Sequence, residues 1–408
     1  MRRGPEGIGP KRSAGGQAAF FHPQNGLLDF LFGCVASSAE ECAAGKLRWG
    51  FNSSRCREPA ETCFSGFALF EGLLFGLFKR YSSLVQRFLV TGGAGFIGSH
   101  IVRALISEGA AVRILDDFSS GREENIAELS PSPCGSGAVV ELYKGDITDP
   151  EACSAACAGV DGVFHEAAMV SVPRSVEEPE RAWAVNATGT LNLLEAARAA
   201  GVERFVFAAS SAAYGESESL PKVETMPVDP RSPYAASKVA GEALLASHGA
   251  AYGMKTVALR YFNVFGPRQA DDSPYTGVIA IFARKLLEGV APVIHGDGNQ
   301  TRDFTYVDNV VAANLAAMRG EVASGSVINV GGGERISILE LYHAVAETLG
   351  SDLQPQMAPS RPGDVRHSLA SLERAQRLLG YKPEISWRDG LDLTLRWYRD
   401  TFDASGPV

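Results

Sequence analysis

Cysteine is scarce in this chain, with seven in 408 residues. Four of them fall in the first 84 residues without the tight C-x-x-C spacing of a metal site: Cys34, Cys42, Cys56 and Cys63. Cys153 and Cys157 stand four apart in an alanine-rich stretch with no histidine or third cysteine nearby, so we expect small buried residues there. The pattern argues against a bound metal and against a disulfide framework, and it favours a reducing cytoplasm.

The chain also lacks a basic excess and a long apolar run. A net charge of −9 argues against nucleic acid as the main partner, although a few arginines in a cleft are enough to bind an anionic small molecule. The apolar segment 67–78 is interrupted by Glu71 and is shorter than the ~20 residues that span a bilayer. It also lies too far from the N-terminus for an ordinary signal peptide, so no stable membrane insertion is expected.

Residues 1–84 differ in character from the rest of the chain. They begin basic and show no clear periodicity. Three interpretations are open: a disordered or weakly ordered tail, an interfacial anchor, or translated upstream sequence with the true start near Val85. The third is attractive because residues 87–93 open a strand and a glycine turn with no preamble. We therefore treat 1–84 as an extension outside the fold prediction.

Strands and helices alternate from Phe88 onward. Expected strands cover 88–91, 112–115, 139–143, 162–165, 205–209 and 256–260, and expected helices cover 97–108, 187–200 and 234–252. The turn-rich segment 130–137 is typical of a surface insertion. This alternation predicts an α/β fold of the Rossmann type, a doubly wound and mostly parallel sheet with helices on both faces.

The rhythm weakens after about Phe265, where proline and glycine become common before helices expected at 338–349 and 372–379. We predict that 85–264 forms the Rossmann domain. Residues 265–400 are expected to form mainly a smaller, mixed α/β substrate-binding lobe, with some segments returning to the first domain. Because ligands of open α/β sheets bind at the carboxyl ends of the strands, the cleft is expected between the two lobes.

A glycine-rich turn joins the first strand to the first helix. Gly92, Gly95 and Gly98 follow a G-x-x-G-x-x-G spacing that surrounds Phe96 and Ile97. Glycine permits the tight turn, the approach of the backbone to a pyrophosphate, and close packing of helix on strand. The helix N-terminus then offers unpaired N–H groups to the phosphates. These five residues are predicted to bind a dinucleotide.

Asp116 ends the second strand, 18 residues after Gly98. A carboxylate there accepts hydrogen bonds from ribose hydroxyls and repels a 2′-phosphate, which favours NAD over NADP. An alternative is that Asp116 only caps a turn, and Asp117 could share its role. Asp146 and Ile147, after the third strand, are placed to contact adenine.

Tyr234 and Lys238 lie four residues apart, on one face of an expected helix. A tyrosine with a pKa near ~10 is a poor base at neutral pH. A lysine beside it favours the phenolate and lowers that pKa. Because the pair follows a dinucleotide-type glycine loop and the Ser210-Ser211 pair, we interpret it as a catalytic base and its partner.

Taken together, these motifs resemble the extended short-chain dehydrogenase/reductase family, specifically its NAD-dependent nucleotide-sugar epimerases, over residues 87–398. Closest in pattern are the UDP-N-acetylglucosamine and UDP-glucose 4-epimerases. Besides the glycine loop and Tyr-x-x-x-Lys, the matching segments are 165–168 (HEAA), 209–215 (ASSAAYG), 260–267 (RYFNVFGP), 296–304 (GDGNQTRDF) and 361–368 (RPGDVRHS).

The resemblance implies roles on the cofactor side of the site. Ala167 and Ala168 would line NAD, and Lys238 would bond the nicotinamide ribose. Tyr261 would close over the nicotinamide. Tyr234 would act as general base on the C4 hydroxyl of the sugar, with Ser210 or Ser211 bridging that hydroxyl and the phenol.

It also implies roles on the substrate side. Asn263 and Arg302 resemble contacts to the sugar diphosphate, and Arg361 and Asp364 resemble contacts to phosphate and to the uridine ribose. The residues agree with this independently, since a guanidinium fork suits phosphate oxygens. Each arginine could instead form only a surface salt bridge.

The residues after Ser210 distinguish the activities of related enzymes. Sugar 4,6-dehydratases carry an Asp-Glu pair there, and nucleotide-sugar decarboxylases place a glutamate at the position of Ala212. This chain has Ser211 and Ala212, so it lacks an acid for a leaving hydroxyl. The resemblance therefore implies reversible oxidation at C4 with non-stereospecific hydride return, an NAD-dependent 4-epimerisation of UDP-hexoses.

Substrate size is indicated by Ser368, at a position that resembles a gatekeeper beside the C2 substituent of the sugar. A small residue leaves room for an N-acetyl group, and Ser171 and Arg174 lie in a run similar to the subgroup that prefers acetylated sugars. We expect UDP-GlcNAc/UDP-GalNAc, with UDP-Glc/UDP-Gal as additional substrates. A glucuronate substrate is the alternative, because Arg174 or Arg366 could pair with its carboxylate.

Two further classes of function remain open, a non-catalytic NAD-binding sensor and a reductase that releases NADH. The sensor reading is disfavoured because this chain keeps both Tyr234 and Lys238. By resemblance, we expect a homodimer formed through a four-helix contact.

Overall fold

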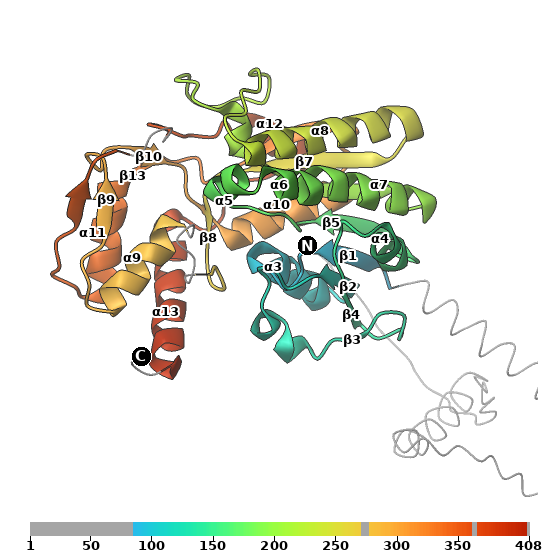
Figure 1. The fold of residues 1–408 in the computed structure, drawn as a ribbon, viewed down its shortest axis with the longest axis horizontal. Coiled ribbons are helices and arrows are strands. Elements are labelled where there is room, and N and C mark those ends of the chain that lie inside the picture. Colours follow the sequence, from blue (N-terminus) through green and yellow to red (C-terminus); the bar gives the residue numbers. More distant parts are fainter. Residues whose placement is uncertain (1–84, 271–276, 361–364, 406–408) are drawn as a thin grey trace, which may run out of the picture. The chain divides into compact units, whose positions relative to one another are not determined.

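The structure is a computed structural model that describes residues 85–270, 277–360 and 365–405 (Figure 1). The extension 1–84, including the apolar segment 67–78, lies outside these ranges. Within the described part of the chain, none of the helices combines the length and apolar character needed to cross a bilayer.

A parallel sheet of eight strands forms the centre of the molecule (Figure 1). Its strands are, in order across the sheet, β12 (Ser326–Val330), β7 (Lys255–Tyr261), β6 (Arg204–Ser210), β5 (Gly162–His165), β1 (Arg87–Thr91), β2 (Ala111–Asp116), β4 (Val140–Lys144) and β3 (Ser132–Pro133). The order runs outward from β1 in both directions, so the predicted doubly wound α/β sheet is confirmed. The six predicted strands are all present within a residue or two of their expected ends.

Two strands of this sheet were not expected. The segment 130–137 contributes β3, which pairs in parallel with β4 at the sheet edge. At the other edge, β12 pairs in parallel with β7, with Ser326 opposite Val257 and Val330 opposite Tyr261. The strand β3 is only two residues long and is defined by its pairing alone. The run Ser326–Val330 is rich in β-branched residues and bounded by glycines, so it carried a strand signal that was not used.

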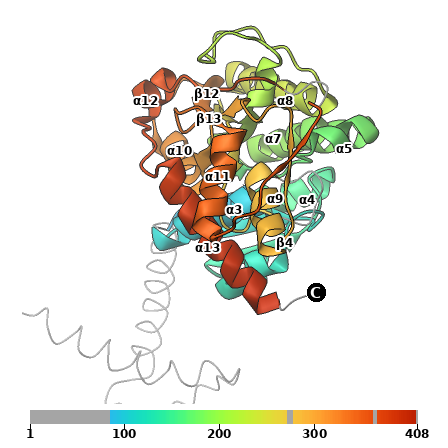
Figure 2. The ribbon, with the colours of Figure 1, turned by 90° about the vertical axis from the view of Figure 1, so that its left-hand side faces the viewer.

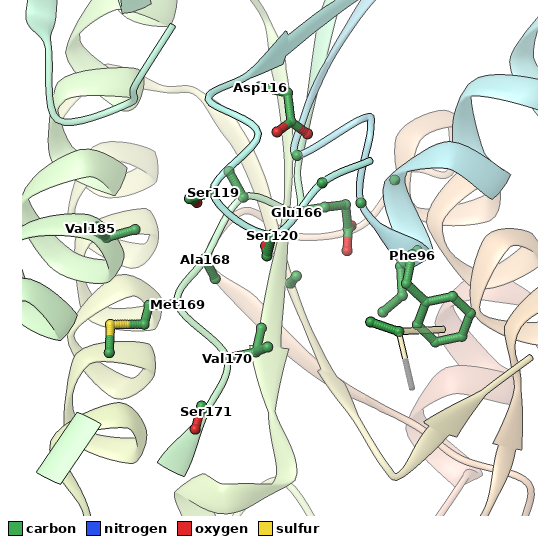
Figure 3. A pocket seen from close by; sticks show the side chains of 18 of the residues that line it. Phe96, Asp116, Ser119, Ser120, Glu166, Ala168, Met169, Val170, Ser171 and Val185 are labelled. Atoms are coloured by element: carbon green, nitrogen blue, oxygen red, sulfur yellow. The ribbon is translucent and has the colours of Figure 1, made fainter. Parts of the chain in front are cut away.

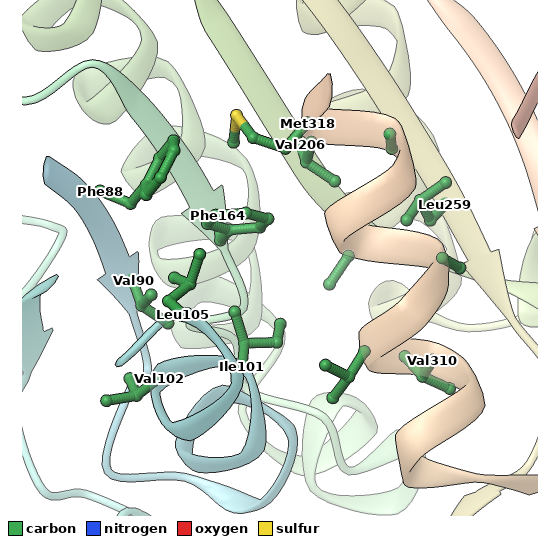
Figure 4. Packing of buried hydrophobic residues seen from close by; sticks show 14 of the residues in the cluster. Phe88, Val90, Ile101, Val102, Leu105, Phe164, Val206, Leu259, Val310 and Met318 are labelled. Atoms are coloured by element: carbon green, nitrogen blue, oxygen red, sulfur yellow. The ribbon is translucent and has the colours of Figure 1, made fainter. Parts of the chain in front are cut away.

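Helices cover both faces of the sheet because side chains alternate along each strand. Phe88, Val90 and Phe164 pack against α3 (Phe96–Ser107), α10 (Val307–Arg319) and α12 (Glu373–Leu379) on one face (Figure 4). Leu89, Val163 and Phe205 point the other way, against α4 (Pro150–Cys157), α7 (Gly189–Ala199) and α8 (Pro233–Tyr252). Cys153 and Cys157 are buried free thiols on α4, as expected, and burial raises the pKa of each to about 12.

Shorter elements complete the Rossmann part. These are η2 (Glu123–Asn125), η3 (Ala127–Leu129), α5 (Val172–Glu177), α6 (Pro179–Trp183), the π-helical turn η4 (Ala184–Thr188) and η5 (Ser211–Tyr214). The helix predicted from residue 187 therefore begins as a π-helical turn, and the α-helix proper starts at Gly189.

A second hydrophobic core lies among the elements at the left of Figure 1, which Figure 2 shows from that side. It joins α9 (Val278–Leu287), α11 (Ile338–Leu349) and α13 (Trp387–Ser405) with three two-stranded pairs: β8 (Val264–Phe265) with β11 (Thr305–Tyr306), β9 (Val293–His295) with β14 (Gln356–Ala358), and β10 (Thr301–Arg302) with β13 (Ile336–Ser337). Three elements of residues 265–400 belong to the central sheet instead: β12 is its edge strand, and α10 and α12 pack on one of its faces. The domain boundaries at 85–264 and 265–400 stay a prediction.

Candidate active site

A cavity of about 470 Å³ opens at the carboxyl ends of the central strands (Figure 3). All the residues predicted to bind the cofactor line it: Gly92, Gly95, Phe96, Ile97, Gly98, Asp116, Asp146, Ile147, Ala167, Ala168, Tyr234, Lys238 and Tyr261. Ser171, Arg174, Ser210 and Asn263 line it as well, whereas Ser211 does not. The sheet thus brings these residues, distant in sequence, to one concave site.

The glycine loop is tightly constrained around this cavity. Gly92 has φ +66°, and a Cβ there would lie 2.8 Å from the backbone nitrogen of Ala167. A Cβ on Gly98 would lie 2.1 Å from the carbonyl oxygen of Gly92. No described side chain caps the N-terminus of α3, so its first N–H groups remain free to bind an anion. The loop therefore fits the pyrophosphate of a dinucleotide.

Asp116 both shapes a turn and faces the cavity. Its carboxylate accepts hydrogen bonds from the N–H groups of Ala94 (2.8 Å) and Phe118 (2.9 Å), and burial raises its pKa. Asp116 therefore does cap a turn, as the alternative proposed, and it also lines the cavity. A carboxylate has about four acceptor sites, so two remain for ribose hydroxyls.

The loop after Asp116 contains cavity residues that the sequence analysis missed. Ser119, Ser120, Gly121, Arg122 and Asn125 line the cavity, and the side-chain amide of Asn125 donates to the carbonyl of Ala94 at 2.8 Å. A usable signal existed, because small and polar residues that directly follow a buried strand lie at the ligand-binding edge of such a sheet.

Tyr234 stands in the first turn of α8, and two serines fix it there. Ser232 caps the helix by accepting from the N–H of Ala235 at 3.1 Å, and the Tyr234 N–H donates to the hydroxyl of buried Ser175 at 3.1 Å. Burial raises the pKa of the Tyr234 phenol, and a hydrogen bond with Ser210 partly offsets that rise. The phenol is therefore placed in the cavity as a group that needs a nearby positive charge to ionise.

Lys238 lines the cavity and also contacts the central sheet. Its Nζ donates to the carbonyl of Ala208 at 2.8 Å and lies 4.9 Å from the ring centre of Phe207. Burial lowers its pKa to about 8. The pKa of Tyr234 is raised by burial rather than lowered as expected. Lys238 keeps two further N–H donors, so its bond to the nicotinamide ribose stays a prediction.

Glu166 is a carboxylic acid in the cavity lining to which no role was assigned from the sequence. The Tyr261 hydroxyl donates to its carboxylate at 2.9 Å and also contacts Asn314. Burial raises the pKa of Glu166 to about 7, while the charge of Lys238 opposes this rise. The neighbouring His165 is buried between the hydroxyls of Thr91 and Thr190, and burial lowers its pKa to about 3, so it is a neutral structural residue.

The two candidate serines are not equivalent. Ser210 lines the cavity at the end of β6, accepts from the N–H of Ala212 at 3.2 Å, and hydrogen-bonds the Tyr234 phenol. Ser211 begins the turn η5 and lies outside the cavity lining. The geometry therefore favours Ser210, rather than Ser211, as the partner of the Tyr234 phenol.

A second cavity, of about 600 Å³, adjoins the first. Arg302 lines it together with apolar residues such as Phe282, Ile294 and Phe304. Asn263, at the unusual φ of +25°, lines both cavities. A flat apolar ring and an attached anion would suit this combination of apolar walls and a guanidinium.

Three further predicted substrate residues either line neither cavity or lie outside the described residues. Ser368 lies on a segment beside β10, where its N–H donates to the carbonyl of Thr301 at 3.1 Å, but it is not among the residues that line either cavity. Arg361 and Asp364 lie outside the described residues. Their roles stay predictions.

Comparison with known proteins identifies the chain at the family level. A model of the NAD dependent epimerase/dehydratase family matches residues 88–331. The chain belongs to this family. The predicted enzyme of the short-chain dehydrogenase/reductase epimerase type, with NAD as its cofactor, is therefore confirmed.

Individual relatives are similar over most of their length. A UDP-glucose 4-epimerase of Mycolicibacterium smegmatis is 41% identical over 317 residues, which are 77% of this chain and 99% of the relative. The solved UDP-glucose 4-epimerase of Thermus thermophilus, in complex with NAD, is 40% identical with a TM-score of 0.70, covering 78% of this chain and 100% of that one. A UDP-N-acetylglucosamine 4-epimerase from Methanobrevibacter ruminantium, solved with UDP-N-acetylmuramic acid, is 39% identical with a TM-score of 0.72, over 78% and 99% of the two chains.

Proposed function

We propose that this protein is an NAD-dependent 4-epimerase of UDP-hexoses. One observation carries the proposal: the Tyr234 phenol, bonded by Ser210, lines a cavity built for a dinucleotide and adjoining a cavity that suits a nucleotide. The named activities of the related proteins support the same reading. When bound, NAD supplies a hydride acceptor and donor and a positive charge.

In this proposal, the chain's own residues move the proton and hold the substrate. Tyr234 takes the proton from the C4 hydroxyl, and Ser210 holds that hydroxyl and the phenol in hydrogen-bonding geometry. Arg302 and the apolar walls of the second cavity grip the uridine diphosphate. Because that grip is confined to the nucleotide end, the hexose is free to present either face of C4.

For the substrate, we propose UDP-GlcNAc/UDP-GalNAc, with UDP-Glc and UDP-Gal as additional substrates. Ser368 is small, and one 39% identical relative is named for the acetylated sugar. The glucuronate alternative needs either Arg174 or Arg366 to pair with the carboxylate, and it is weakened because each already has an acidic partner. Arg174 pairs with Glu178 at 2.9 Å, and Arg366 pairs with Asp297 at 2.9 Å.

The direct test incubates purified protein with UDP-GlcNAc, UDP-Glc and UDP-glucuronate separately and separates the products. A Tyr234→Phe variant should lose all but a few per cent of the epimerisation rate, and the proposed base is wrong if it keeps more. Tyr252→Phe is the matched control, since Tyr252 is an exposed tyrosine on the same helix. Absence of any conversion would favour the sensor alternative, and net build-up of NADH absorbance would favour a reductase.

We also propose that two copies associate and that the enzyme works in the cytoplasm. Val176, Trp183 and Leu191 are exposed apolar residues on α5, α6 and α7, whose neighbour is α8. Burying them in a four-helix contact would remove apolar surface from water. Sedimentation of the wild type against Trp183→Glu tests this, with a monomeric wild type as the contrary result. The free thiols Cys153 and Cys157 suit a reducing compartment.

A further inference from the structure

Asp303 is a fully buried carboxylate between β10 and β11, with 0% of its surface exposed. One oxygen accepts from the N–H of Gly332 at 2.7 Å, and the N–H of Gly333 lies 3.2 Å from the same oxygen. The other oxygen accepts from the N–H of Ala370 at 3.0 Å. Burial of an unpaired charge is costly unless hydrogen bonds replace its hydration, so this set of donors is required for the carboxylate to be tolerated.

The backbone around Asp303 is built to admit it. A Cβ on Gly331 would lie 2.7 Å from the carboxylate, and a Cβ on Gly332 would lie 2.5 Å from the carbonyl oxygen of Phe304. The chain can therefore approach the carboxylate this closely only as glycine. The arrangement is a dedicated cradle rather than an incidental contact.

The segments that meet at Asp303 are those that border the substrate side of the site. Ala370 follows Ser368 by two residues on the segment beside β10. Asp303 itself follows Arg302, which lines the second cavity. Its backbone carbonyl accepts from the side-chain amide of Asn263 at 3.1 Å, and Asn263 lines both cavities. The carboxylate thus ties the loop after β12, on the central sheet, to the segment carrying Ser368.

We propose that Asp303 is a positioning residue that sets the affinity for the UDP-sugar, because its carboxylate clamps the Ser368 segment to the loop after β12 at the end of the central sheet. This inference rests on the proposed function, which gives Ser368 and Asn263 their places beside the substrate. Asp303 does not itself reach either cavity lining, so it acts on binding through these neighbours.

The clamp is sensitive to protonation. Burial, and to a smaller extent the charge of Glu334, raises the pKa of Asp303 to about 6, even though three backbone N–H groups oppose the rise. Tyr381 also faces it from the other side, donating to the Gly331 carbonyl at 2.8 Å, and His367 lies on the clamped segment. A protonated carboxyl has one acceptor oxygen fewer for these N–H groups, so affinity should weaken as the pH falls through about 6.

Protonation of Asp303 should have opposite effects on substrate affinity and on the free energy of unfolding. The pKa of Asp303 in the fold is raised above its ordinary value of 3.8, so protonation is favoured by the fold relative to the unfolded chain. The contribution of this group to stability is therefore fully present below pH 3.8 and is lost as the pH rises through about 6. Mild acid should raise KM without lowering Tm through this residue.

The test is Asp303→Asn, which replaces one acceptor oxygen by an amide that faces backbone donors. KM for the UDP-sugar should rise about tenfold or more, the scale of one lost charge-assisted hydrogen bond, while kcat stays within about threefold. The NAD content of the purified protein should be unchanged. Asn309→Asp is the matched control, because Asn309 accepts from the N–H groups of Glu384 and Ile385 away from both cavities. This control should lower Tm and leave KM unchanged.

The pH dependence of KM supplies a second measurement. The wild-type KM should rise between pH 7 and pH 5, and His367→Gln should retain that rise while Asp303→Asn should abolish it. An unchanged KM in Asp303→Asn, or a flat wild-type KM over this range, overturns the proposal. If Asp303→Asn does not fold, the rise must persist in both His367→Gln and Glu166→Gln, because Glu166 lines the first cavity and has a pKa of about 7. Its loss in either variant then overturns the proposal.

Binding of UDP, measured by calorimetry, separates this inference from the proposed function. A wild type that binds UDP but epimerises no sugar would overturn the proposed function alone. The clamp would then stand or fall on whether Asp303→Asn weakens binding of UDP-GlcNAc, which carries the hexose beside Ser368, by the same factor of about ten.

Discussion

Glu242 on α8 and Arg260 on β7 form a buried, two-pronged ion pair, with Nε–Oε1 and Nη2–Oε2 both 2.7 Å apart. Both side chains are almost fully buried, and the guanidinium lies 4.6 Å from the ring centre of Tyr214. Glu242 is one turn beyond Lys238 on the same helix. The pair therefore joins α8 to β7 and helps to fix the position of Tyr234 and Lys238, on the same helix, relative to the cavity.

Removing one charge of this pair should be costly. Glu242→Gln leaves the Arg260 guanidinium buried without its counter-charge, and we expect a loss of ~3–5 kcal/mol in the free energy of unfolding. Urea denaturation measures this directly. Glu288→Gln breaks the partly exposed Arg284–Glu288 pair and should change stability by less than ~1 kcal/mol. Equal losses in the two variants would contradict the role given to Glu242.

The two serines after β6 should differ in their effect on catalysis. Ser210→Ala removes the hydrogen bond that lowers the Tyr234 pKa, so the rate should fall by ~10²-fold and the acid limb of the pH–rate profile should move to higher pH. Ser211→Ala should keep most of the rate, since Ser211 lies outside the cavity lining. Steady-state kinetics across pH decides between them, and a larger loss in Ser211→Ala would reverse the assignment.

The negative charge of Glu166 should raise the pKa of Lys238. The pKa of Lys238 is lowered by burial to about 8, and the negative charge of Glu166 raises it within that balance. Glu166→Gln should therefore lower the Lys238 pKa further and move the alkaline limb of kcat/KM to lower pH. Asn314→Asp alters the same Tyr261 contact without removing the Glu166 charge and should not shift that limb downward. An unchanged alkaline limb in Glu166→Gln would show that the two groups are not coupled.

Ser368 should control which sugars are accepted. Ser368→Tyr places a bulky ring where we expect the C2 substituent, so kcat/KM for UDP-GlcNAc should fall at least ~10-fold through steric exclusion, while UDP-Glc turnover is largely kept. The ratio of the two substrates in one preparation serves as its own control for folding. A parallel loss on both substrates would mean that Ser368 does not face that group.

The sequence predicted those cavity residues that belong to a local pattern. The spacing of Gly92, Gly95 and Gly98 after a strand, and the pairing of Tyr234 with Lys238 on a helix, depend on neighbours only a few positions away. Hydrophobic periodicity likewise defined most strands and helices, because burial on a sheet face repeats every second residue. Glu166 and Ser119 belong to no spaced motif and were missed, although both follow a buried strand within a few residues and line the cavity.

Short-range patterns in the chain were enough to predict the parallel α/β sheet and the glycine loop, and to propose Tyr234 as the base, since each depends on neighbours only a few positions away. The folded chain was needed to show that Lys238 bonds Ala208, that Ser210 and not Ser211 lines the cavity, and that Asp303 joins segments nearly 70 positions apart. Those outcomes depend on burial and on which backbone donors a folded chain brings within hydrogen-bonding distance. Burial also reversed the expected sign of the Tyr234 pKa shift, because desolvation outweighs the local hydrogen bond to Ser210.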